Sequence, residues 1–183
     1  TSRKIELGYA IVRASRITYV GELDWELYIP TEFTLGVYDE IVSAGAPIGL
    51  VHAGYHALNS LRIEKAYRHW GHDIGCEDNL IQSGLGFAAK PDAGDFIGRD
   101  AFVQQKAAGL PDRRTLQFKL DNPEPLLYHS EPIIMDNSIV GYLSSGMYGH
   151  SVGTAIGMGF VEAAGLNVDR IAEAAFEIEV AKE

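Results

Sequence analysis

The spacing of apolar residues changes near residue 110, which predicts two parts of different structure. In the first part, Phe33, Val37 and Ile41 recur at helical spacing. Thr31 precedes them as a suitable N-cap, and Gly45 follows as the glycine expected to end the helix. The pattern therefore predicts a helix over this segment, within a mixed α+β domain formed by residues 1–110.

Two further segments of the first part show helical or turn patterns. Residues 54–67 are apolar over more than one stripe, which predicts a well-buried helix that contains Arg62. A buried arginine is costly unless it is paired, so Arg62 is expected to anchor either a neighbouring loop or a ligand carboxylate. Residues 79–92 predict a turn and a strand, and a short helix to about residue 108 is closed by Gly109.

Strand patterns dominate the start of the chain. Residues 5–19 predict one strand, or two with a break near Gly8, and alternating residues from Trp25 to Ile29 predict the next. A hairpin with a four-residue loop would place Tyr19 opposite Glu26. A ring beside a carboxylate suits a flat heterocycle with N–H donors. The commoner interpretation of such a pair is a plain surface contact on a half-solvated sheet.

Short apolar-alternating segments separated by turns follow in residues 111–183. They cover residues 115–120, 132–135, 139–144, 153–161 and 174–180. This near-regular spacing predicts a small antiparallel barrel or sandwich. The run Asp136-Asn137-Ser138 is typical of a turn between two of these strands.

Charge and composition restrict the possible partners and the compartment. The formal net charge of −10 argues against nucleic acid as a partner, because it repels phosphate. No apolar run is long enough for a membrane helix, so no membrane partner is expected. The single cysteine, Cys76, cannot form an internal disulfide and has acidic neighbours, so it is interpreted as structural in a reducing compartment. We therefore expect a cytoplasmic protein.

A metal site is the obvious hypothesis for the segment that holds His69, His72 and Asp73. Zinc sites need three or four ligands with a supporting second shell, and Gly71 interrupts the helical spacing here. The other four histidines form no recognisable ligand set. We predict no metal site, and instead packing by Trp70 and local hydrogen bonds by the histidines.

Several motifs occur in an order that is specific when they are taken together. They are Tyr19-x-Gly21-Glu22-x-x-Trp25-Glu26, Leu61-Arg62-Ile63-Glu64-Lys65, Gly71-His72-Asp73-Ile74, Ser83-Gly84-Leu85-Gly86, Asp95-Phe96-Ile97-Gly98-Arg99 and Ser144-Ser145-Gly146. In this order the chain resembles the glycine-cleavage T-protein (aminomethyltransferase) family over essentially its whole length. The run from Ala57 to Gly71 is most similar to the folate-binding C-terminal half of sarcosine and dimethylglycine dehydrogenases.

This resemblance implies a fold, a cofactor and two binding residues. The fold would be part of the T-protein folate-binding domain in residues 1–110, followed by the family's small antiparallel β-barrel in residues 111–183. The cofactor would be tetrahydrofolate, which receives a one-carbon unit. Glu26 matches the glutamate that holds the pterin, and Tyr19 matches a tyrosine that lines the same pocket. In the dehydrogenase branch an N-terminal FAD domain oxidises an N-methyl amine, and eukaryotic members would lie in the mitochondrial matrix.

Departures from the family pattern leave a second function open. The family's catalytic aspartate lies upstream of the Tyr-x-Gly-Glu motif, and no Asp precedes Tyr19 here, so no catalytic residue is assigned. Leu58 and Asn59 replace an Arg-Asp pair, and Asp24 replaces a glycine. The chain also starts without methionine, so we expect a piece of a longer protein whose N-terminal domains are its partners, inactive alone. The alternative is a non-catalytic relative similar to the pyruvate dehydrogenase phosphatase regulatory subunit.

Overall fold

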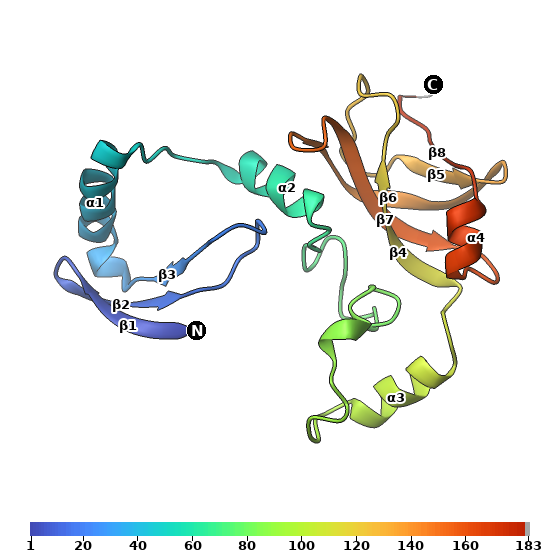
Figure 1. The fold of residues 1–183 in the computed structure, drawn as a ribbon, viewed down its shortest axis with the longest axis horizontal. Coiled ribbons are helices and arrows are strands. Elements are labelled where there is room, and N and C mark those ends of the chain that lie inside the picture. The colour runs from blue at the N-terminus through green and yellow to red at the C-terminus, as the bar shows by residue number, and fades with distance from the viewer. Residues whose placement is uncertain (182–183) are drawn as a thin grey trace. The chain divides into compact units, whose positions relative to one another are not determined.

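A computed structural model describes residues 1–181 and divides the chain into two units, Thr1–Lys65 and Ala66–Glu183. The first unit contains a three-stranded antiparallel sheet in the order β1-β2-β3 (Figure 1). Its strands are β1 (Ser2–Leu7), β2 (Ala10–Ser15) and β3 (Glu26–Tyr28). Strands β1 and β2 are joined at Gly8, whose φ of +57° is a conformation that favours glycine. The expected break near Gly8 is therefore confirmed.

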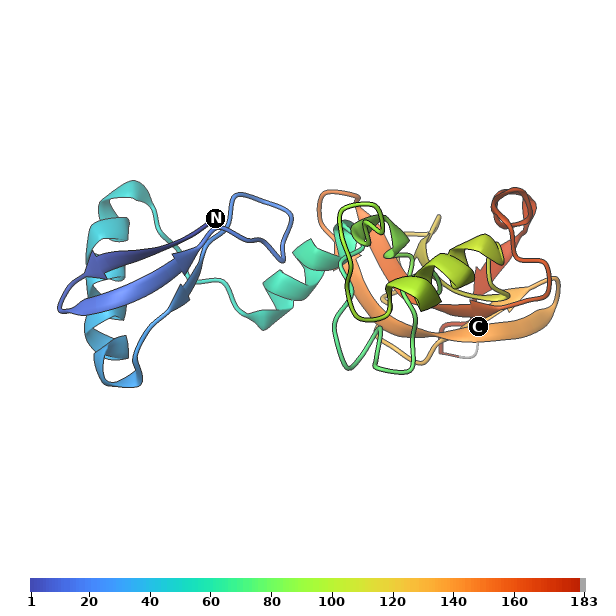
Figure 2. The same ribbon diagram turned by 90° about the horizontal axis from the view of Figure 1, so that it is seen from below.

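One face of this sheet is covered and the other carries polar side chains. Helix α1 (Thr34–Gly45) lies along the covered face (Figure 2), where Ala10, Val12 and Val37 are buried together. Side chains alternate between the two faces of a strand, so the residues between the buried ones point the other way. The exposed residues Arg13, Glu26 and Tyr28 therefore share the uncovered face.

The register of the hairpin differs from the predicted one. Strand β3 pairs with β2, with Arg13 opposite Tyr28 and Ser15 opposite Glu26, so the predicted pairing of Tyr19 with Glu26 is wrong. Residues 16–25 form a long loop instead. In this loop the Thr18 hydroxyl accepts hydrogen bonds from the backbone N–H groups of residues 20 and 21, at 3.2 and 2.9 Å. Such local bonds give the backbone an alternative to the strand ladder.

Both predicted ends of the first helix also need correction. A 3-10 turn, η1 (Thr31–Phe33), precedes α1, and no side-chain cap from Thr31 is formed. Gly45 is the last residue of α1, and its φ of −81° is ordinary for a helix. The 3-10 helix η2 (Ala46–Ile48) continues directly from it. Gly49, with φ of +82°, ends it. Gly45 serves packing instead, since a Cβ there would lie 2.4 Å from Cδ1 of Leu50.

Gly36 in α1 offers a test of this account of the helix. A Cβ at this position would meet nothing within 4 Å. We expect Gly36→Ala to stabilise the first unit by about 0.5–1 kcal/mol, because glycine loses more backbone entropy than alanine in a helix. Urea unfolding followed by Trp25 fluorescence in a Trp70→Phe background measures the change. The matched control, Gly45→Ala, should destabilise the same unit because of Leu50, and a lower midpoint for Gly36→Ala would contradict the prediction.

The second predicted helix is confirmed in a slightly shorter form, α2 (Tyr55–Glu64), but the prediction that it is well buried is wrong, because only Ser60, Arg62 and Ile63 of its residues are buried. Arg62 is only 4% exposed, and its Nε donates to Oδ1 of Asn59 at 3.3 Å. One of the partners that the burial of this arginine requires therefore lies within its own helix, one turn earlier.

The second unit begins with a segment of turns before its sheet. The strand predicted within residues 79–92 is wrong, because turns and η3 (Gly86–Ala88) occupy this segment. The predicted short helix is confirmed as α3 (Arg99–Ala107), and Gly109 follows it with φ of +93°. No helix within residues 1–181 is long and apolar enough to cross a lipid bilayer.

Five antiparallel strands form the sheet of the second unit, in the order β4-β7-β6-β5-β8. They are β4 (Arg113–Lys119), β5 (Pro132–Met135), β6 (Ser138–Gly149), β7 (Thr154–Glu162) and β8 (Phe176–Ile178). The antiparallel strands of the predicted small barrel or sandwich and the turn at Asp136-Asn137 are confirmed, but the sheet is open rather than closed, with β4 and β8 at its edges. Helix α4 (Val168–Glu173), whose N-cap residue Asn167 accepts a hydrogen bond from the backbone N–H of Arg170, was not predicted.

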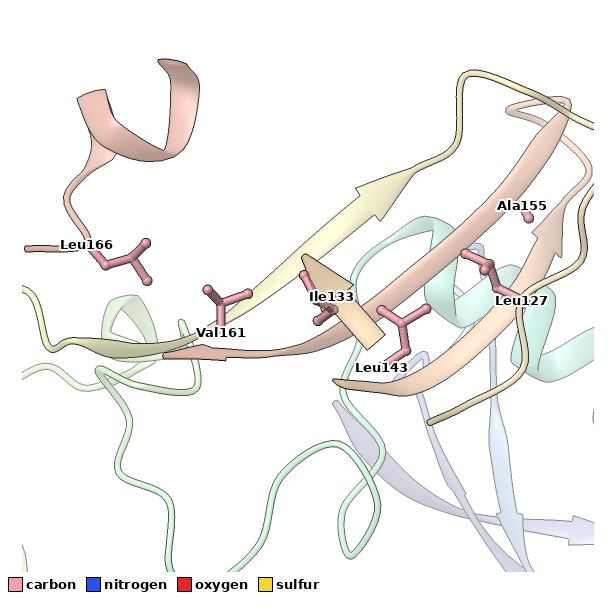
Figure 3. Close-up of a cluster of buried hydrophobic side chains, with 6 residues drawn as sticks. All are labelled: Leu127, Ile133, Leu143, Ala155, Val161 and Leu166. Carbon is pink, nitrogen blue, oxygen red and sulfur yellow. The ribbon is translucent and has the colours of Figure 1, made fainter. Parts of the chain in front are cut away.

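Apolar side chains on one face of this sheet form the main core of the unit. The cluster, drawn in Figure 3, comprises Leu127, Ile133, Leu143, Ala155, Val161 and Leu166. Met158 and Ile156 are buried on the opposite face of β7. Both faces of β7 are therefore packed along much of its length, and the face opposite the cluster becomes half-buried at Phe160 and exposed at Glu162.

Candidate functional site

Three side chains form a linked polar group on the uncovered face of the first unit's sheet. The Tyr28 hydroxyl donates a hydrogen bond of 2.7 Å to Oε2 of Glu26. The guanidinium carbon of Arg13 lies 4.2 Å from the centre of the Tyr28 ring. Because these residues lie on paired strands, the sheet fixes their order across the face as Arg13, Tyr28 and Glu26.

The charge of Glu26 keeps Tyr28 protonated, so the tyrosine donates the hydrogen bond and the carboxylate accepts it. The hydrogen bond to Glu26 and the negative charge of that carboxylate raise the pKa of Tyr28 above its ordinary value of 10. Tyr28 therefore remains a donor at neutral pH. Glu26 is exposed, so its carboxylate also presents an acceptor to solvent on this face.

Tyr19, the other predicted binding residue, is located differently from Glu26. It is half-buried in the loop of residues 16–25 rather than on a strand. The structure brings Tyr28 beside Glu26 along the same strand, whereas Ser15 occupies the position across the hairpin from Glu26. A pterin-binding role for Tyr19 stays a prediction.

Sequence reasoning missed Tyr28 and Arg13, although a signal for one of them was present. Residues two apart in a strand lie on the same face, so Glu26 and Tyr28 could have been recognised as neighbours from their spacing. Arg13 could not, because its position opposite Tyr28 depends on the register of β2 against β3.

A second polar group lies in the other unit, where Asp73 is only 2% exposed. Its Oδ1 accepts hydrogen bonds of 2.5 Å from both Ser144 and Ser145, and its Oδ2 accepts one of 2.8 Å from the N–H of His69. Consecutive strand residues normally point to opposite faces. A β-bulge between Leu143 and Ser145 removes this alternation, so both hydroxyls reach one carboxylate oxygen.

The histidines near Asp73 make ring contacts and do not assemble a ligand set. The ring of His72 lies edge-on to those of His69 and His129, with centres 5.9 and 6.3 Å apart. Among residues 1–181, no three His, Cys, Asp or Glu side chains are grouped so as to hold a metal ion. Trp70 is 68% exposed, so the prediction that it packs locally is wrong.

The family of the chain follows from comparison with known proteins. The model of the GCVT N-terminal domain matches residues 1–93, and that of the glycine cleavage T-protein C-terminal barrel domain matches residues 113–183. These two domains, with the α+β fold and the antiparallel C-terminal sheet, define an aminomethyltransferase-type protein. The chain belongs to the glycine cleavage T-protein family.

Its relatives include much longer proteins whose names indicate N-methyl amine substrates. The chain is 40% identical over 161 residues to 4-methylaminobutanoate oxidase (formaldehyde-forming) of Paenarthrobacter nicotinovorans, covering 87% of this chain and 19% of that one. It is 40% identical over 152 residues to mitochondrial sarcosine dehydrogenase of Homo sapiens, covering 82% of this chain and 16% of that one. The chain therefore spans less than a fifth of the length of these relatives.

A solved structure supports the fold. The crystal structure of glycine cleavage system aminomethyltransferase T from Bartonella henselae matches with a TM-score of 0.77 at 19% identity. The match covers 94% of this chain and 46% of that chain. The predicted fold class and family are thus confirmed, whereas the domain boundary near residue 110 stays a prediction.

Proposed function

We propose that the chain is the tetrahydrofolate-binding, one-carbon (aminomethyl) transfer part of a flavoenzyme similar to sarcosine and dimethylglycine dehydrogenases. The observation that carries the proposal is the exposed carboxylate of Glu26 on the uncovered sheet face, within the segment that matches the GCVT N-terminal domain. The 40% identity to two relatives named for N-methyl amine substrates supports the same class of reaction.

The donors of a pterin fit the acceptors on this face. A carboxylate accepts two parallel hydrogen bonds from adjacent N–H groups, and such charge-assisted bonds are strong. Glu26 offers this acceptor pair, and the bond from Tyr28 to Oε2 holds the carboxylate in place. Tetrahydrofolate, when bound, supplies the nitrogen atoms that receive the one-carbon unit. Within this proposal Glu26 orients the pterin, and Tyr19 contributes an aromatic wall from the loop of residues 16–25.

The chemistry on the amine is assigned to other parts of a longer protein. FAD would be bound in an N-terminal domain, and the domains preceding this segment would be its partners. The mitochondrial name of the human relative supports a matrix location for a eukaryotic parent. The 183-residue chain alone is then expected to be inactive toward N-methyl amines.

Two measurements test the proposal. Calorimetry of the intact parent should show saturable tetrahydrofolate binding, whereas assays of the purified 183-residue chain with sarcosine or dimethylglycine should show no amine-dependent formaldehyde or methylenetetrahydrofolate. A parent that does not bind tetrahydrofolate contradicts the binding role. Turnover by the chain alone contradicts the assignment of the amine chemistry to other domains of the parent.

A second function is favoured by one observation in α2. Asn59 stands where the T-protein motif has Asp, and here its side chain holds Arg62 at 3.3 Å, while Leu58 replaces the motif's arginine. Loss of that arginine suits a non-catalytic relative that retains the scaffold for regulation, as in the pyruvate dehydrogenase phosphatase regulatory subunit. An intact parent that binds tetrahydrofolate but oxidises no N-methyl amine would favour this function.

A further inference from the structure

The second unit contains a large cavity that the proposed folate site does not use. Its volume is about 1180 Å³, and it lies between the segment 70–78 and strands β6 and β7. Two carboxylates attach this segment to the sheet. Asp73 binds the hydroxyls of Ser144 and Ser145, and Oδ1 of Asp78 accepts a 2.6 Å hydrogen bond from Nη1 of Arg113. The wall formed by residues 70–78 is therefore held at two points.

On one side of the cavity, the guanidinium group of Arg113 lies between an aromatic ring and two carboxylates. The guanidinium carbon of Arg113 lies 3.5 Å from the centre of the Phe160 ring. The same guanidinium contacts Asp78 at 2.6 Å and Glu162 at 3.0 Å. An aromatic face combined with carboxylates is an arrangement that favours cations.

The rest of the cavity lining also combines aromatic rings with a carboxylate. Tyr142, the cross-strand partner of Phe160, is 55% exposed, and Trp70 in the opposite wall is 68% exposed. Glu77, also exposed, adds a carboxylate to the lining. Among residues 1–181 the lining holds the carboxylates Glu77, Asp78 and Glu162, as well as the buried Asp73, against Arg113 as the one Lys or Arg side chain.

We propose that this cavity binds a small organic cation through a substituted ammonium group, with Trp70 and Tyr142 as aromatic contacts and Glu77 as a counter-charge. The excess of carboxylates disfavours an anionic ligand. A metal ion does not suit the site, because no three suitable ligands converge within residues 1–181. An alkylammonium group suits it, since its diffuse charge is attracted by aromatic faces as well as by carboxylates. This proposal does not rest on folate binding.

Choline and its neutral analogue 3,3-dimethylbutan-1-ol test the proposal, because they have nearly the same shape and differ in charge. The chain has two tryptophans, so Trp25→Phe leaves Trp70 as the only tryptophan reporter. In the full 183-residue chain with this substitution, choline should change Trp70 emission saturably. The neutral analogue should bind at least about tenfold more weakly, because a cation–π contact and a counter-charge are absent.

Two variants and a matched control locate the binding. Tyr142→Leu and Glu77→Gln should each weaken choline binding about three- to tenfold, as expected for loss of one aromatic or ionic contact. Glu124→Gln, an exposed glutamate outside the cavity lining, should leave it unchanged. Glu77 is exposed, so its variant should fold even if Tyr142→Leu does not. Equal affinity for choline and the neutral analogue, no saturable signal, or unchanged binding in Glu77→Gln would overturn the proposal.

Discussion

Replacement of Asp73 by alanine is expected to destabilise the second unit by about 3–5 kcal/mol, the largest effect on stability that we predict. The side chain is 2% exposed and accepts three hydrogen bonds, two from serine hydroxyls and one from a backbone N–H. Hydrogen bonds to a charged group contribute about 1.5–3 kcal/mol each, and the donors left behind, of which Ser145 is buried, lose this partner. Urea unfolding, followed by Trp70 fluorescence in a Trp25→Phe background, reports this unit alone.

A double-mutant cycle separates the network from simple loss of volume. Ser145→Ala should cost about 1.5–3 kcal/mol in the otherwise unchanged chain and much less when Asp73 is already alanine, because the two residues share one bond. Asp92→Ala is the matched control, since Asp92 is exposed, and it should change stability by no more than about 0.5 kcal/mol. If Asp73 and Ser145 show additive effects, the carboxylate does not hold the bulge of β6.

Replacement of Glu26 by glutamine is expected to weaken tetrahydrofolate binding by the intact parent about ten- to a hundredfold. Glutamine keeps the size of the side chain, and its carbonyl oxygen can still accept the bond from Tyr28. Its NH₂ group would meet the donors of the pterin, however, and the charge-assisted bond, worth roughly 1.5–3 kcal/mol, would be lost. Calorimetric titration with tetrahydrofolate measures the change.

Two controls accompany this substitution. Glu22→Gln, in the loop of the same hairpin, removes only an exposed contact of 3.9 Å to Lys65 and should affect folate binding little. Reduction of the parent's flavin by its amine should be unaffected by Glu26→Gln, because that step is assigned to another domain. Tetrahydrofolate binding as tight as in the unchanged parent would show that Glu26 is not the pterin anchor.

Local pattern was sufficient where an element is determined by its own residues. The spacing of Phe33, Val37 and Ile41 predicted α1, and alternation predicted most strands of the second unit, because apolar residues must gather on one face to be buried. The Asp136-Asn137 turn was predictable for a similar reason. Both residues adopt positive φ values, +52° and +59°, which Asp and Asn tolerate better than most residues.

Pattern failed where several local structures compete for the same residues. Residues 16–25 contain β-prone side chains, yet the Thr18 hydroxyl and the Asp24 carboxylate bind nearby backbone N–H groups and keep the segment in a loop. At the end of α1, the pattern predicts the left-handed conformation at Gly45, whereas the structure has it at Gly49. Contact with Leu50, which lies outside the helix, is what requires a glycine at residue 45.

The sequence by itself determined the family, the α+β class and Glu26 as the candidate folate-binding carboxylate, since these depend on residue identity and order. Only the tertiary structure decided which side chains lie across the sheet from Glu26 and around Asp73. The register of β2 against β3 placed Arg13 opposite Tyr28, and Ser15 in place of Tyr19 opposite Glu26, and a one-residue bulge in β6 turned two serines toward Asp73. Register and bulges arise from pairing between distant segments, and shifting a strand by one residue reverses the face of every side chain, so no local pattern can specify them.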